Sequence, residues 1–203
     1  MKPRKQVRQS PVRSTGIGYS HRYRVAAIFE SELEKDYFFW KCFEDRTYDY
    51  LRMQPEPLIY KVGGRDRRYT PDAELSELGH VFVDEVKYWA TSQRAKNLDK
   101  FNRIASLYED EGKTFRMVTE RDIRVGYRAT NLRYLAPAWA HRSPQEEMER
   151  VQKLLPYRDA PIDKFLSDLT RNGFHPCLAR RAIAHKLIRC DITLPWNRLY
   201  LTW

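Results

Sequence analysis

Apolar and polar positions in the central part of the chain follow two periods, and each period predicts a different kind of element. Apolar residues three to four positions apart indicate amphipathic helices, whereas short alternating runs indicate strands with one buried face. We expect helices at residues 31–44 and 92–111, and strands at residues 58–62, 68–75, 80–87 and 114–119. This order, a helix, three strands, a helix and a strand, predicts an α/β fold with a small mixed sheet flanked by helices.

The C-terminal part has a different pattern and predicts a small second domain. Periodicity fades around residues 125–143, which we interpret as a linker or an edge segment of the first domain. Beyond it we expect helices at 144–155, 161–172 and 176–189, and a two-stranded hairpin from alternation between Ile192 and Trp203. Three helices and a hairpin are the layout of a winged helix. We therefore place the first domain at residues 23–140 and a winged-helix-like C-terminal domain at 141–203.

The uneven distribution of charge indicates an anionic partner. The formal net charge is +10, yet residues 1–24 carry +7 and residues 171–203 carry +5, so the centre is slightly acidic. Residues 1–22 are basic, polar and interrupted by Pro and Gly, and we expect a flexible arm there. Basic ends suit the phosphate backbone of nucleic acid, because phosphate contacts supply most sequence-independent affinity.

Two expected helices carry candidate DNA-binding cations. These cations are Arg94 and Lys96 on the 92–111 helix, and Arg180, Arg181, Lys186 and Arg189 on the 176–189 helix. The first pair is placed to meet phosphate oxygens at the helix start. The 176–189 helix either lies in a DNA major groove, or uses its arginines for solubility or for contact with another protein.

The main candidate chemistry lies where a hairpin brings two acidic residues together. Asp72 and Glu85 lie on consecutive expected strands, and Lys87 shares a face with Glu85. Adjacent carboxylates repel, and each pKa rises unless a cation lies between them. Because Mg²⁺, or Mn²⁺ in its place, prefers oxygen ligands, Asp72, Glu85 and the Val86 carbonyl form a candidate metal site. Lys87 would serve a metal-bound water or the charge developing on a phosphate. The simpler interpretation is a proline-initiated turn beside a solvated Glu-x-Lys pair.

Glu34 is a candidate third carboxylate at the start of the first helix. Ser31 and Glu34 have the spacing of a capping box, which explains the glutamate by helix capping alone. A glutamate in this turn can also face the sheet and complete a metal site, and both roles are compatible. Glu30 and Glu32 compete with Glu34 for the second role.

Other features bear on metal binding and on location. His175, Cys177, His185 and Cys190 cluster in the sequence, but their spacing matches no common zinc pattern, so they form either a zinc site or ordinary core and surface positions. The chain lacks the run of roughly 18 apolar residues that a membrane helix needs, and the basic N-terminus is not followed by the apolar segment of a secretory signal. We expect a cytoplasmic protein with reduced cysteines.

Several sequence segments resemble one nuclease family. They are SELEKDYF (31–38), MQPEPLIY (53–60), RYTPDAEL (68–75), VFVDEVKYW (81–89) and FRMVTERDIR (115–124). A Pro-Asp pair, a gap, then Glu-x-Lys on a hairpin, preceded by a helical Glu, is similar to the PD-(D/E)xK nuclease superfamily. The segments resemble the TnsA transposon endonucleases within it, over about residues 25–125.

The resemblance implies a restriction-endonuclease-like core with Mg²⁺ at its site. Carried over, Glu34, Asp72 and Glu85 would hold metal, Lys87 would serve the attacking water, and Gln54 would help shape the site. It also implies double-stranded DNA as the substrate: the family cuts the 5′, non-transferred strands at transposon ends, in the bacterial cytoplasm at the nucleoid. An integrase-like transposase, TnsB, processes the other strands, and an AAA+ regulator, TnsC, contacts the C-terminal region. The alternatives are a stand-alone phage or repair nuclease of the superfamily, or a non-catalytic DNA-binding subunit.

Overall fold

The chain divides into two compact units, residues 1–123 and 124–203. The computed structural model describes residues 16–20, 23–44, 48–155 and 159–202. The second unit therefore begins well before residue 141, where we expected it. The expected linker is folded: α5 (Arg128–Leu135) and η1 (Ala136–Ala140) both contact α8 (Cys177–Ala184) of the same unit.

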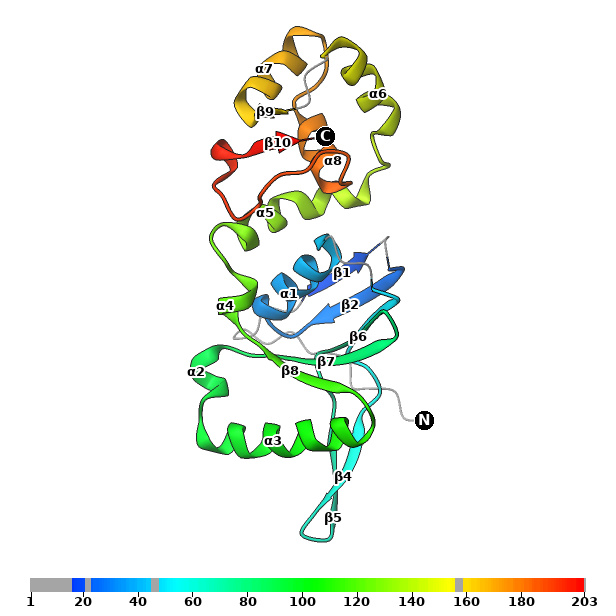
Figure 1. The fold of residues 1–203 in the computed structure, drawn as a ribbon, viewed down its shortest axis with the longest axis vertical. Helices are drawn as coiled ribbons and strands as arrows, with labels where there is room; N and C mark the ends of the chain where they lie inside the picture. The colour runs from blue at the N-terminus through cyan, green and yellow to red at the C-terminus, as the bar shows by residue number, and fades with distance from the viewer. Residues whose placement is uncertain (1–15, 21–22, 45–47, 156–158, 203) are drawn as a thin grey trace. The chain divides into compact units, whose positions relative to one another are not determined.

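A four-stranded mixed sheet organises the first unit (Figure 1). Its strands, in spatial order, are β3 (Tyr50–Met53), β6 (Ala73–Glu77), β7 (His80–Val86) and β8 (Thr114–Val118). The first three strands are antiparallel, whereas β8 runs parallel to β7. A parallel neighbour requires a crossover connection, and α3 (Ala95–Asp110) supplies it. The expected α/β fold with a mixed sheet and flanking helices is confirmed.

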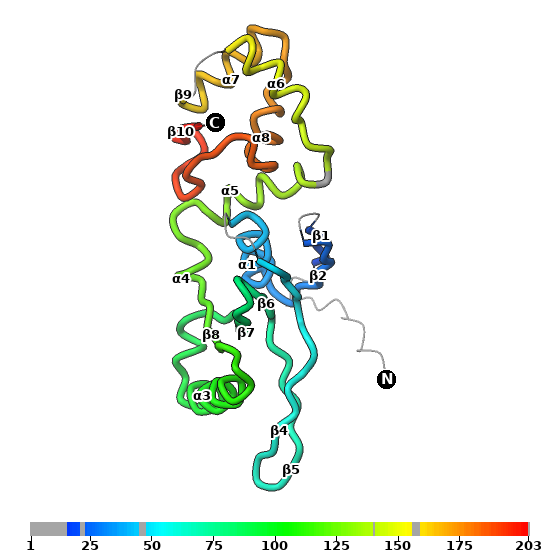
Figure 2. The backbone as a smooth tube through the Cα atoms, turned by 45° about the vertical axis from the view of Figure 1, so that its right-hand side comes forward, coloured from blue at the N-terminus to red at the C-terminus, as the bar shows by residue number. Residues whose placement is uncertain are grey.

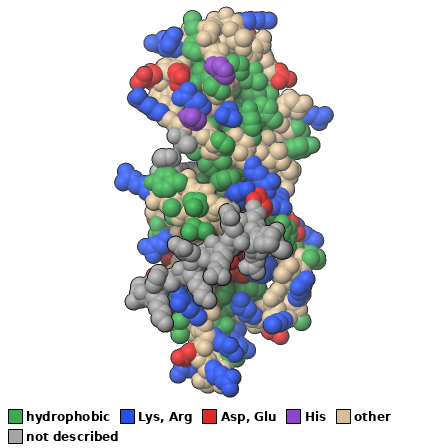
Figure 3. Space-filling model, turned by 180° about the vertical axis from the view of Figure 1, so that it is seen from behind, with side chains coloured by type: hydrophobic (Ala, Val, Ile, Leu, Met, Phe, Trp, Pro, Cys, Tyr) green, Lys and Arg blue, Asp and Glu red, His purple; other side chains and the backbone are tan. Residues whose placement is uncertain are grey.

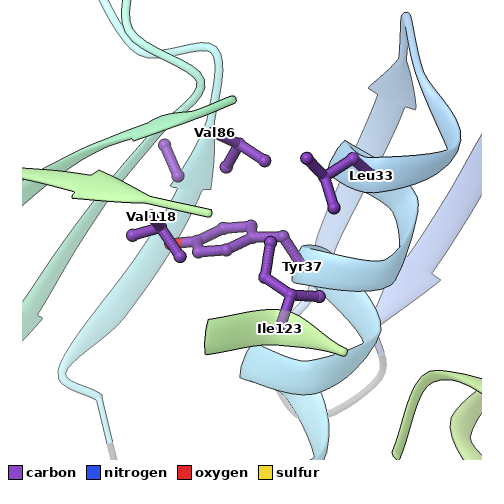
Figure 4. Close-up of a cluster of buried hydrophobic side chains, with 6 residues drawn as sticks. Leu33, Tyr37, Val86, Val118 and Ile123 are labelled. Carbon is purple, nitrogen blue, oxygen red and sulfur yellow. The ribbon is translucent and has the colours of Figure 1, made fainter. Parts of the chain in front are cut away.

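The two faces of the sheet bury different helices. Val86 packs with Leu33 and Tyr37 of α1 (Glu32–Phe43), and with Ile123 of α4 (Glu120–Ile123) (Figure 4). Val83 lies an odd number of residues from Val86 on β7, so it points to the other face, where it packs against α3. Side chains that alternate along β7 therefore reach opposite sides of the sheet.

The expected strand over residues 68–75 is wrong, because the chain breaks at Thr70-Pro71-Asp72. Proline lacks the N–H that a ladder needs, and the break separates β5 (Arg65–Tyr69) from β6. β5 pairs instead with β4 (Leu58–Val62), and the two form a separate two-stranded hairpin.

The N-terminal part holds an antiparallel strand pair that the sequence did not predict. Gly16–Ser20, placed in the flexible arm, forms β1 and pairs with β2 (Val25–Phe29). Gly18 packs tightly here, since a Cβ added to it would lie 2.9 Å from the Phe29 ring. The rest of the expected arm, residues 1–15 and 21–22, lies outside the described residues.

In the connection between β7 and α3, α2 (Trp89–Ser92) is a single short turn.

Beyond α5 and η1, the described part of the second unit contains three α-helices, one 3₁₀ helix and two short strands. The elements are α6 (Gln145–Leu154), β9 (Asp159–Pro161), α7 (Ile162–Arg171), α8, η2 (Trp196–Arg198) and β10 (Tyr200–Thr202). The expected hairpin within residues 192–203 is wrong: β10 pairs with β9, far away in sequence, and Thr202 also bridges Arg189 (Figure 2). Along the chain that the structure describes, no helix is long and apolar enough to cross a membrane.

Candidate functional site

A cleft of about 380 Å³ lies in the first unit, where the first turn of α1 meets the β6 and β7 ends. It is lined by Glu30, Ser31, Leu33, Glu34, Asp72, Glu85, Val86, Lys87, Tyr88 and Thr91. All four side chains expected to carry the chemistry, Glu34, Asp72, Glu85 and Lys87, therefore line one cleft.

The β6–β7 register brings Asp72 beside Glu85. Ala73 is opposite Asp84, so Asp72 and Glu85 are opposite each other, one step beyond the last ladder pair. The Asp72 N–H donates to the Asp84 carbonyl at 3.1 Å. The Val86 N–H donates to Asp72 Oδ2 at 2.7 Å, which fixes the carboxylate at the strand end.

Gln54 positions the backbone of Asp72. Its N–H donates to the Asp72 carbonyl at 2.8 Å, and its φ of +51° turns the chain directly after β3. Its side-chain Nε2 lies 3.4 Å from the Ile28 carbonyl of β2 and does not line the cleft. Gln54 therefore contacts the site through its backbone, at the Asp72 carbonyl.

Burial and crowded negative charge raise the pKa of Asp72 to about 8, first through desolvation and then through Glu85, with Glu34 adding to the effect. The Val86 N–H and Lys87 act in the opposite direction. Burial also raises the pKa of Glu34, which gains a further contribution from Glu30 and Glu85. The cleft thus concentrates acidic groups whose charged forms disfavour one another.

Glu85 is held from two sides. Lys87 Nζ donates to its Oε1 at 2.5 Å, as expected for two residues on the same strand face. The Tyr69 hydroxyl donates to its Oε2 at 2.6 Å, and both side chains are buried. Sequence reasoning missed Tyr69, because an unbroken strand over 68–75 would have turned Tyr69 away from Asp72. The break at Pro71 is the signal that could have found it.

Glu34 belongs to the capping box of α1 and also lines the cleft. The Ser31 hydroxyl accepts from the Glu34 N–H at 3.2 Å and donates to Glu34 Oε1 at 2.9 Å. Glu34 Oε2 accepts from the Glu30 N–H at 2.8 Å. Of the two competing residues, Glu30 also lines the cleft, whereas Glu32 pairs with Lys35 at 2.7 Å and does not. Helix capping therefore orients Glu34 at the cleft.

The donor chemistry of the cleft fits a hard divalent cation. Three carboxylates lie there, and Mg²⁺ prefers oxygen ligands. A cation would also relieve the repulsion by Glu85 and Glu34 that, after burial, contributes to the raised pKa of Asp72. No ready-made shell of three acidic, His or Cys side chains occurs among the described residues. Each carboxylate instead accepts hydrogen bonds from the protein's own donors. Among the described residues, His175, Cys177, His185 and Cys190 do not form a group of three metal ligands either.

A buried ion pair supports the strand that carries the site. Arg116 of β8 contacts both carboxylate oxygens of Asp84, at 2.7 and 2.8 Å, and the Tyr37 hydroxyl donates to Oδ2 at 2.7 Å. Asp84 is completely buried. The cluster ties β7 to β8 and α1 directly beside Glu85, and it was not predicted from the sequence.

The six expected DNA-binding cations are in two different situations. Arg94 and Lys96 are exposed at the start of α3. The helix expected over 176–189 is too long, because α8 ends at Ala184 and Lys186 has a φ of +58°. Arg180 lies 5.1 Å from the Tyr134 ring centroid, and Arg181 donates to Glu147 and to the Arg142 carbonyl, each at 3.0 Å. Arg189 is exposed, with its backbone paired to Thr202. These four do not form one row on a helix.

Replacing Tyr69 by phenylalanine is expected to lower the free energy of unfolding by about 1–3 kcal/mol, because a buried carboxylate oxygen loses its donor. Chemical denaturation measures this change. Tyr60→Phe is the matched control, since its side chain packs against the same cluster and its hydroxyl has no partner among the described residues. Equal loss of stability in both variants would contradict the role assigned to Tyr69.

Replacing Arg181 by methionine is expected to destabilise the second unit by about 1–3 kcal/mol, because two hydrogen-bonded contacts are lost. Arg189→Met should change stability by less than about 0.5 kcal/mol, as is usual for an exposed side chain. Thermal unfolding compares the two variants. If Arg181→Met unfolds like the wild type while its DNA binding weakens, Arg181 acts as a DNA contact instead.

Comparisons with known proteins assign no family to this chain. A scan against protein-family models found no match, and a search of curated proteins found none either.

Proposed function

We propose that the chain is a metal-dependent DNA endonuclease of the PD-(D/E)xK type, similar to the TnsA endonucleases. The observation that supports this most strongly is that Glu34, Asp72, Glu85 and Lys87 line one cleft. Glu34 lies on α1, Glu85 on β7, Asp72 directly before β6 and Lys87 directly after β7, and they are the set that the resemblance implies. Acidic groups beside a nucleic-acid backbone are unfavourable unless a cation bridges them to phosphate.

Each side chain has a distinct role in this proposal. Glu34, Asp72 and Glu85, with the Val86 carbonyl, would hold Mg²⁺ or Mn²⁺. The ion, when bound, supplies a water of lowered pKa and positive charge at the scissile phosphate. Lys87 orients Glu85 through its ion pair, and its partly exposed side chain lines the cleft, where its positive charge would stabilise charge that develops on the phosphate. Tyr69 holds the other oxygen of Glu85, so that the carboxylate keeps one orientation.

The arrangement of elements supports the same assignment. A helix, three antiparallel strands, a crossover helix and a parallel fourth strand suit a restriction-endonuclease-like core. In the second unit, the order α6, β9, α7, α8, the Arg189 bridge and β10 suits a winged-helix-like domain, with β10 between β9 and Arg189. That unit would contact DNA or a regulatory ATPase.

We further propose that the substrate is the end of a DNA transposon, where the enzyme cuts the 5′ strand beside a partner transposase. The test is strand-specific cutting of a transposon-end duplex in Mg²⁺, with and without an integrase-like partner transposase. The wild type should cut the 5′ strand only with the partner, and Lys87→Ala should not cut. Cutting by the protein alone would favour a stand-alone nuclease. If Asp72→Ala and Lys87→Ala leave every activity intact, the protein is a non-catalytic DNA-binding subunit.

A further inference from the structure

The β4–β5 hairpin is a two-stranded ribbon that extends past α3 and away from the core (Figures 1 and 2). Its five-pair ladder is closed by Gly63 and Gly64, which both have positive φ, as a tight hairpin turn requires. Its exposed charged side chains are Lys61, Arg65, Asp66, Arg67 and Arg68. Lysine and arginine side chains gather at this end of the first unit (Figure 3). A strand so exposed and so basic needs an explanation beyond packing.

One face of the ribbon continues into the cleft. Side chains alternate along a strand, so Arg65, Arg67 and Tyr69 share a face, whereas Lys61 and Arg68 lie on the other. Tyr69 ends this row and donates to Glu85 in the cleft. At about 3.4 Å per residue, Arg67 and Arg65 stand roughly 7 and 14 Å along the strand from Tyr69. The row therefore leads outward from the site.

A second basic row borders the first. Lys96, Lys100 and Arg103 are spaced four and three residues apart on α3, which puts them on one helix face, and all three are exposed. Lys100 Nζ lies 4.8 Å from the centre of the Tyr69 ring, so this row meets the ribbon at the residue that contacts Glu85.

None of these five cations forms an ion pair with a described carboxylate. Elsewhere in the same unit, basic side chains such as Lys35, Lys87, Lys113 and Arg116 do pair with acids. Five cations that form no ion pair with a described carboxylate produce a positive potential, which favours an extended anionic partner.

We propose that Arg65, Arg67, Lys96, Lys100 and Arg103, here called the basic track, hold the phosphate backbone of double-stranded DNA and direct one strand to the cleft. This rests on the proposed nuclease function and assigns its substrate a path. The roughly 12 Å-wide major groove admits a two-stranded ribbon. A membrane is disfavoured, because the Gly63-Gly64 tip offers no apolar side chain for insertion.

The test compares two double variants that remove the same charge from opposite faces of the ribbon. Arg65→Gln/Arg67→Gln alters the basic track, whereas Lys61→Gln/Arg68→Gln alters the other face. Binding to a short DNA duplex is measured by fluorescence anisotropy over a range of salt concentrations, with chelator present to prevent cutting. Two lost phosphate contacts should weaken binding by roughly 60-fold near 0.1 M salt and reduce the salt slope by about 1.8. The control variant should lose no more than a few-fold, as expected from the change in overall charge.

Equal losses in both variants, or no loss in either, would overturn the basic track. The basic track would also be overturned if Arg65→Gln/Arg67→Gln kept duplex binding but lost binding to vesicles of anionic lipid. The nuclease proposal is tested separately, by cutting in Mg²⁺. A wild type that binds duplex through Arg65 and Arg67 but does not cut even with the partner transposase leaves the track standing and removes the nuclease. If the wild type cuts DNA but Arg65→Gln/Arg67→Gln binds duplex as tightly as the wild type, the nuclease stands and the basic track is removed.

Discussion

Replacing Asp72 by alanine is expected to slow metal-dependent DNA cutting by about a thousandfold or more, while duplex binding is kept or tightened. The reason is the place of Asp72 in the cleft, beside Glu85 and Glu34, where an acidic oxygen is lost from the proposed ion site. A thousandfold corresponds to about 4 kcal/mol of transition-state stabilisation, within the range of metal and electrostatic contributions. Binding survives because removing a negative charge relieves repulsion with phosphate.

Single-turnover cutting rates and anisotropy titrations measure the two effects of the Asp72 change. Asp66→Ala is the matched control, because it removes the same charge from an exposed position on β5. A control variant that loses as much activity as Asp72→Ala would attribute the effect to net charge. Cutting by Asp72→Ala at the wild-type rate would remove Asp72 from the site.

Replacing Asp84 by alanine is expected to lower the free energy of unfolding by about 3–5 kcal/mol, because Arg116 keeps its charge in a partly buried position without its partner. Tyr37, fully buried, also loses the acceptor for its hydroxyl. The loss concerns stability: Asp84 points to the face of β7 opposite Glu85, and it does not line the cleft. Urea denaturation monitors the change.

A second variant distinguishes the ion pair from the space it fills. Asp84→Leu/Arg116→Met removes both charges and keeps apolar volume, and such replacements of buried pairs are often close to neutral. The double variant should therefore be clearly more stable than Asp84→Ala. If it is as unstable as Asp84→Ala, packing around these side chains, and not the unpaired charge, causes the loss.

The elements that the sequence predicted best are those whose apolar residues recur with a regular period. α1, β7, α3 and β8 all have this pattern, and the structure places them within a few residues of the expected bounds. The spacing of Asp72 and Glu85 also predicted their meeting, because an antiparallel hairpin fixes which residues face each other.

The parts that could not be predicted depend on contacts distant in sequence. α5 and η1 lack a clear amphipathic period, yet Asn131 binds the Ile192 and Leu194 carbonyls and Trp139 binds the Ala184 carbonyl. The alternation at the C-terminus indicated a local hairpin, whereas β10 found its partner in β9. Period-two patterns show that a strand has a buried face, but they do not say which strand covers its edge.

The side chains around Glu85 show the same limit. Tyr69 reaches the site only because the chain breaks at Pro71, which changes the direction in which its side chain points. Asp84 and Arg116 lie on different strands, and their pairing follows from the parallel β7–β8 register. A sequence marks such residues as charged or aromatic and leaves their partners undefined.

In the proposed nuclease, Glu34, Asp72 and Glu85 surround one divalent ion beside Lys87. Calorimetric titration of Mn²⁺ into the protein bound to duplex DNA measures this directly. The wild type and Lys87→Ala should bind the ion, whereas Asp72→Ala/Glu85→Ala should lose that binding while keeping the duplex. Equal Mn²⁺ binding by the carboxylate variant and the wild type, or none by the wild type, would contradict the account.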